Sequence, residues 1–147
     1  MMAAEVNQET IRVLAEERQV TRLGESVFRT GRISEDALTF LSATLARMAA
    51  IYQKLNVDRV RAVATSAVRD AGNQEEFIAR ASAILGVGVE VISGPEESRL
   101  IQMGVESRWP RPKERTLIID VGGGSTELIV CQGGELIDAV SKPLGAV

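Results

Sequence analysis

The residues at 120–127, Asp-Val-Gly-Gly-Gly-Ser-Thr-Glu, include types that can hold a phosphate group and a magnesium ion. Consecutive glycines let a backbone adopt left-handed conformations and bring its N–H groups close to an anion. The residues that would contact a phosphate are Gly122, Gly123, Gly124, Ser125 and Thr126. Asp120 ends an apolar run and can reach Mg²⁺ directly or through water, and Glu127 is a second acid. A glycine-rich hairpin turn that needs no ligand is the alternative.

A second group of interest is a carboxylate on the apolar side of a predicted helix. In "PEESRLIQMGVESR" (95–108), a helical period places Leu100, Ile101 and Val105 on one face, with Glu97 in its middle. An acid in the first turn is favoured by the helix dipole by about 0.3–1 kcal/mol, which explains an acid but not this face. Burial against a cleft would raise the pKa of Glu97 toward that of a general base. Both interpretations remain open.

Several helices and strands must position these groups. Residues 1–32 contain short β-like runs, and alternating helices and strands follow. One predicted helix begins after Ser34 as N-cap, a second after Asn73 with Glu76 as its capping-box partner, and a third at Gly94-Pro95. Strands are predicted near 60–63 and at 87–93. This alternation predicts a mostly parallel sheet, and hence an α/β fold.

The pattern changes after the basic link at 111–115. "TLIIDV", "TELIVCQ" and "ELIDAVS" are strand-like runs joined by "GGGS" and "GG", which predicts an antiparallel meander. We therefore expect one domain over 1–110 and the beginning of a second over 111–147.

Composition narrows the possible functions. The chain has 147 residues, 45% of them hydrophobic and 25% charged, which is typical of a globular protein. A net charge of −3 gives no general attraction to nucleic acid or to an anionic membrane, so we expect neither as a partner. Cys131 is the single cysteine and histidine is absent, so we expect a reducing cytoplasm and base chemistry performed by carboxylates or lysines. No apolar run is long enough to span a bilayer.

Four stretches together resemble one family. "ERQVTRLGESVFRTG", "AVATSAVRDAGN", "VEVISGPEESRLIQMGV" and "LIIDVGGGSTELIV" are similar to the exopolyphosphatase/guanosine pentaphosphate phosphohydrolase family over nearly the whole chain. The resemblance implies a ribonuclease-H-like domain of the actin, sugar kinase and Hsp70 superfamily, with a mixed sheet and flanking helices. It also implies magnesium-dependent removal of the terminal phosphate from polyphosphate or guanosine pentaphosphate, in a cleft between two related domains.

By position, the resemblance assigns the catalytic acid to Glu97 and a phosphate loop to 120–127. It places Arg69 near the phosphates, with Arg22 as a weaker phosphate-binding candidate, and a magnesium ion near Asp120 and Glu127. Glu97 would orient a water molecule for in-line attack and accept its proton, as the helical face also suggests.

The sequence departs from the family at both ends. The family opens with an Asp-x-Gly-Ser-Asn-Ser loop, which has no counterpart before residue 120, and it continues beyond "SKPLGAV". We therefore expect an incomplete chain that alone is weakly active or inactive, and that self-associates as a homo-oligomer to cover its apolar strands. Two other functions remain open: an ATP-dependent kinase of the same superfamily, and a non-catalytic module that binds polyphosphate or a nucleotide, or serves assembly.

Overall fold

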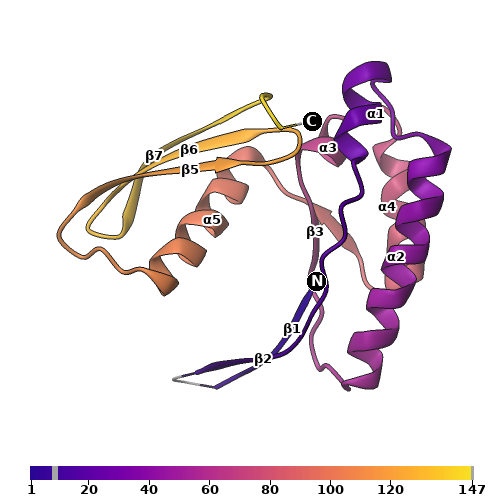
Figure 1. Cartoon of the computed structure of the whole chain (residues 1–147), viewed down its shortest axis with the longest axis horizontal. Coiled ribbons are helices and arrows are strands. Elements are labelled where there is room, and N and C mark those ends of the chain that lie inside the picture. The colour runs from indigo at the N-terminus through magenta and orange to yellow at the C-terminus, as the bar shows by residue number, and fades with distance from the viewer. Residues whose placement is uncertain (8–9, 147) are drawn as a thin grey trace.

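The computed structural model describes residues 1–7 and 10–146, and Figure 1 shows its arrangement. The strands are β1 (Met2–Val6), β2 (Ile11–Glu16), β3 (Ala62–Ala64), β4 (Val89–Val91), β5 (Arg115–Val121), β6 (Thr126–Gln132) and β7 (Glu135–Lys142). The helices are α1 (Leu23–Thr30), α2 (Glu35–Lys54), α3 (Ser66–Arg69), α4 (Gln74–Leu85) and α5 (Gly94–Arg108). No helix in these described ranges is long and apolar enough to cross a membrane.

The first part of the chain combines an antiparallel hairpin, a parallel strand pair and a pair of helices. β1 pairs with β2 antiparallel, and β3 pairs with β4 in parallel. Helices α2 and α4 pack against each other, and their apolar faces contribute to a core that α1, α3, β3 and the connecting loops complete. The core residues with the least exposed side chains include Leu38, Val68, Phe77 and Ala81. Within the part of the chain that the structure describes, the mostly parallel sheet predicted from the sequence is therefore present only as the β3–β4 pair.

The helix boundaries follow from local capping chemistry. Ser34 Oγ accepts a hydrogen bond from the Ala37 N–H, which confirms the predicted start of α2. Gly86 ends α4 with a φ of 69°, a left-handed conformation that glycine adopts without strain. At α5, the side chain of Ser93 accepts from the Glu96 N–H, and Pro95 occupies the first turn as predicted.

The second part is the predicted meander. β5, β6 and β7 pair in sequence order, all antiparallel, and α5 packs against β6 and β7 (Figure 1). Ile129 and Cys131 of β6 are buried, whereas Leu117 and Ile119 of β5 are more than half exposed. The meander therefore has one face covered by α5 and one apolar face that no described residue covers. The division at 110/111 stays a prediction, although α5 precedes it and packs on the meander.

Three expectations about the helices differ from the structure. Residues 23–30 form a helix, α1, where only β-like runs were predicted, and α3 is a single turn that the pattern did not indicate. Asn73 does not cap α4 through its side chain. Its Oδ1 instead accepts from the Ile33 N–H at 2.9 Å, and its Nδ2 donates to the Ile33 carbonyl at 3.0 Å. The side chain is buried, so satisfying a distant loop's backbone takes precedence over capping.

Candidate active site

The glycine loop between β5 and β6 lies directly against α3. A Cβ atom added to Gly124 would stand 2.5 Å from the Ser66 Oγ, and one added to Gly122 would stand 3.1 Å from the Ser125 carbonyl oxygen. None of the three glycines has a positive φ, so the predicted left-handed conformations are wrong. Glycine is required here at Gly124 because the loop approaches α3 too closely for a side chain.

A cavity of about 440 Å³ opens beside this loop. Its lining comes from α3 and its C-cap, the start of α5, the glycine loop and the end of β7: Ser66, Arg69, Asp70, Gly94, Pro95, Ser125, Ala139, Val140, Ser141 and Pro143. A neighbouring cavity of about 300 Å³ shares Ser66 and Asp70 and is also lined by Gly124. The loop, the single turn α3 and the α5 N-terminus therefore converge on one hollow region of the surface.

Glu97 lies in the first turn of α5, on the side that packs toward α3 and the meander. Its side chain is only 15% exposed. Burial raises the pKa of Glu97, and the charge of Glu127 raises it further; the interactions with Arg69 and Thr65 oppose this shift. A half-buried carboxylate with a raised pKa matches the requirement for a general base that works near neutral pH.

Arg69 connects α3 to the start of α5. Its Nη1 donates to the Ile92 carbonyl at 2.7 Å and to Glu97 Oε2 at 3.3 Å. The Arg69 side chain also lines the cavity and is 26% exposed. Arg69 therefore fixes the orientation of Glu97 while its guanidinium remains beside the space that an anion would occupy.

The two acids predicted to bind metal face each other across the β5–β6 ladder. Asp120 is the register partner of Glu127, so both side chains project from the same face of the meander. Asp120 is exposed, whereas Glu127 is buried and accepts a hydrogen bond from the Ser141 hydroxyl at 2.7 Å. Among residues 1–7 and 10–146, no three acidic or cysteine side chains gather as a metal cluster. The donor set fits Mg²⁺, which commonly takes one or two carboxylates and completes its shell with water and substrate phosphates.

The remaining predicted residues divide into two groups. Ser125 is buried and lines the cavity, as a phosphate ligand would. The Thr126 hydroxyl donates to the Leu144 carbonyl, so the segment after β7 crosses the loop at this point. Arg22 lies elsewhere: it is exposed and lines a separate hollow along α1 with Arg29. The structure does not bring Arg22 into the cavity that Arg69 lines.

Three residues of this region escaped the sequence analysis. Ser66 and Asp70 line both cavities, and Ser141 holds the buried carboxylate of Glu127. Ser66 and Asp70 flank Arg69 in "TSAVRD", so the position of Arg69 was the available signal for them. The sequence carried no signal for Ser141, because this residue reaches Glu127 only through the pairing of β7 with β6.

The mixed α/β layers, with a glycine loop and an acid-bearing helix at one cavity, define an α/β protein of the actin-like, ribonuclease-H-like class, as predicted. Solved structures agree with this class. An Aquifex aeolicus Ppx/GppA family member is 33% identical with a TM-score of 0.82, with 98% of this chain and 47% of that chain covered. An exopolyphosphatase from Cytophaga hutchinsonii is 30% identical with a TM-score of 0.93, with 98% of this chain and 46% of that chain covered.

An exopolyphosphatase-like protein is 34% identical with a TM-score of 0.89, with 97% of this chain and 46% of that chain covered. The model of the Ppx/GppA phosphatase family matches residues 2–147. The chain belongs to the Ppx/GppA phosphatase family, and it spans about half the length of these solved chains.

Proposed function

We propose that the protein is a phosphohydrolase that releases the terminal phosphate from inorganic polyphosphate, from guanosine pentaphosphate, or from both. The observation that carries this proposal is the placement of Glu97, which is half-buried, has a raised pKa and is held by Arg69, a residue that lines the glycine-loop cavity. Membership of the Ppx/GppA phosphatase family supports the same reaction class.

In this proposal Glu97 orients a water molecule for in-line attack and accepts its proton. Arg69 and the N–H groups of the glycine loop stabilise negative charge on the equatorial oxygens of the transferred phosphoryl group. Ser125, buried at the edge of the cavity, supplies a further hydroxyl donor. Asp120 and Glu127 would hold Mg²⁺, which would supply charge neutralisation on the bridging and leaving oxygens.

We further propose that these 147 residues alone are weakly active and form homo-oligomers. The chain spans about half of its solved relatives, which supports low activity in isolation. Leu117, Ile119 and Val121 are each more than half exposed on the uncovered face of β5, which supports association between copies. A reducing cytoplasm remains our proposal for the compartment, with Cys131 as a buried free thiol.

Phosphate release under magnesium tests the proposed reaction. The protein should be in excess over labelled substrate, with polyphosphate and guanosine pentaphosphate offered separately, so that slow turnover is still detected. Glu97→Gln should abolish release. Glu96→Gln is the matched control, because Glu96 is the adjacent glutamate but its carboxylate pairs with Arg99 at 2.8 Å on the exposed side of α5. Equal loss in both variants would refute a specific role for Glu97.

A second function is a non-catalytic module that binds polyphosphate or a nucleotide. Two predicted phosphate ligands already have partners within the chain: Arg69 pairs with Glu97, and the Thr126 hydroxyl donates to Leu144. Saturable substrate binding without any phosphate release from wild-type protein would favour this function over hydrolysis.

A further inference from the structure

Three side chains form a row across the meander, on the face that α5 covers. Asp120 on β5 is the register partner of Glu127 on β6, and Glu127 is in turn the register partner of Ser141 on β7. Side chains of directly paired residues project from the same face of a sheet. The row therefore runs from an exposed carboxylate on one edge strand, through a buried carboxylate, to a half-buried hydroxyl on the other edge strand.

Glu127 is the most enclosed member of this row, because it is only 1% exposed. The Ser141 hydroxyl donates to Glu127 Oε1 at 2.7 Å. Among residues 1–7 and 10–146, this is the only hydrogen bond that the Glu127 carboxylate accepts. One hydrogen bond compensates poorly for the hydration that a buried carboxylate loses, so a cation at the second oxygen, Oε2, would stabilise Glu127.

The positive charge in contact with this region goes to the neighbouring acid of α5. Arg69 pairs with Glu97 at 3.3 Å, whereas neither Asp120 nor Glu127 forms an ion pair with any residue that the structure describes. The charge of Glu127 also raises the pKa of Glu97, so the two carboxylates interact electrostatically. The uncompensated negative charge therefore lies on β5 and β6, at the two acids that the proposed function assigns to Mg²⁺.

The first turn of α5 packs directly on Ser141. A Cβ atom added to Gly94 would stand 2.8 Å from the Ser141 Cβ and 3.3 Å from its Oγ, so there is no room for a side chain at position 94. Gly94 and Ser141 also line the edge of the 440 Å³ cavity together. Contact with the helix backbone on one side and the bond to Glu127 on the other leave the Ser141 hydroxyl few orientations.

We propose that Ser141 is a positioning residue of the magnesium site: its hydroxyl occupies Oε1 of Glu127 and leaves Oε2 as the oxygen that binds Mg²⁺ together with Asp120. This inference rests on the proposed function, which assigns the two acids to the metal. Hydrogen bonds to ligating carboxylates fix their orientation, and the loss of one commonly weakens metal binding by about 10–100-fold. Gly94 supports the arrangement, because its missing side chain lets α5 close over Ser141.

Metal binding to the full chain without substrate tests this role. Titration calorimetry with Mg²⁺, and electron paramagnetic resonance with Mn²⁺ as a spectroscopic probe, give the Kd for each protein. Ser141→Ala should raise the Kd by about 10–100-fold. Ser141→Cys keeps a weak donor at the same position, so its Kd should lie between those of wild type and Ser141→Ala.

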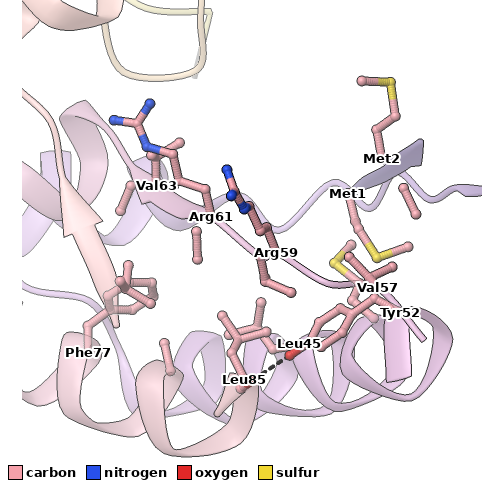
Figure 2. A pocket seen from close by; sticks show the side chains of 17 residues that line it. Met1, Met2, Leu45, Tyr52, Val57, Arg59, Arg61, Val63, Phe77 and Leu85 are labelled. Atoms are coloured by element: carbon pink, nitrogen blue, oxygen red, sulfur yellow. Dashed lines mark hydrogen bonds between the residues drawn. The ribbon is translucent and has the colours of Figure 1, made fainter. Parts of the chain in front are cut away.

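Tyr52→Phe is the matched control. It also removes one buried hydroxyl, which donates to the Leu85 carbonyl between α2 and the end of α4 (Figure 2), far from the meander in sequence and contacts. Its Kd for Mg²⁺ should stay within about twofold of wild type. Far-UV circular dichroism verifies that each variant folds, and if Ser141→Ala does not fold, the weaker binding expected of Ser141→Cys carries the same comparison.

An unchanged Kd in Ser141→Ala would overturn the proposal, as would the absence of saturable Mg²⁺ or Mn²⁺ binding by wild type at about 10 mM metal. Asp120→Asn and Glu127→Gln separate this inference from the metal site itself. If both weaken binding while Ser141→Ala does not, the magnesium site stands and only the role of Ser141 is refuted. Phosphate release that does not depend on Glu97 would instead refute the proposed hydrolysis and leave the comparison of Kd values intact.

Discussion

Replacing Gly124 by alanine tests whether the glycine loop is shaped by its contact with α3. The added Cβ would stand 2.5 Å from the Ser66 Oγ, which is far inside van der Waals contact, and would also meet the Phe28 ring at 3.7 Å. Ser66 is buried, so its hydroxyl has little room to move away. Overpacking of this kind costs about 1–3 kcal/mol, and we expect Gly124→Ala to lower the free energy of unfolding by that amount.

Denaturant unfolding of four proteins measures the effect: wild type, Gly124→Ala, Ser66→Ala and the double variant. Removing the Ser66 hydroxyl relieves the clash, so the double variant should recover more than half of the loss, with a coupling energy of about 1 kcal/mol or more. Gly104→Ala is the matched control. No heavy atom lies within 4 Å of its added Cβ, and α5 should gain about 0.5–1 kcal/mol from the better helix former.

A neutral Gly124→Ala, or a loss that Ser66→Ala leaves unchanged, would refute the close contact between the loop and α3. The glycines would then have to be explained by a bound ligand or by the turn alone.

Three further predictions concern other contacts. Burial raises the pKa of Glu97 in the folded state, so between the unfolded and folded pKa values the folded protein binds more protons than the unfolded chain. The free energy of unfolding therefore falls as pH rises through that window. In thermal unfolding followed by circular dichroism, Glu97→Gln should be more stable than wild type at pH 7 but not at pH 3. Asn73→Ala removes both hydrogen bonds to Ile33 and should cost about 1–3 kcal/mol in urea unfolding, with a loss under about 0.3 kcal/mol counting against that role. Ile119→Thr should shift sedimentation velocity toward smaller species, and a wild-type chain that stays monomeric at high concentration would contradict association through the β5 face.

The long elements could be predicted because their signals are local. α2, α4 and α5 carry helical periodicity and recognisable ends, and the meander carries alternating apolar runs with glycine turns. α1 lacked such a signal because the residue before it is Arg22, in a left-handed conformation with φ 48°, and not a typical N-cap residue. α3 is four residues long, too short for any periodicity to appear.

The site was predictable to the extent that one helix face determines it. Glu97 is half-buried because its position on α5 puts it on the inward face of the helix, which the spacing of apolar residues already indicated. The partner of Glu97 was not predictable in this way. Arg69 reaches it only because α3 and the start of α5 are brought together by the β3–β4 pair. The conformation of the glycine loop likewise depends on Ser66, which is distant in sequence.

Magnesium-dependent phosphate release by wild type, Glu97→Gln and Glu96→Gln is the measurement that tests the proposed function most directly. We expect release by wild type and by Glu96→Gln, with polyphosphate or guanosine pentaphosphate, and none by Glu97→Gln although that variant still binds substrate. Release by Glu97→Gln at the wild-type rate would contradict the account, because the carboxylate that Arg69 holds would then have no part in the reaction.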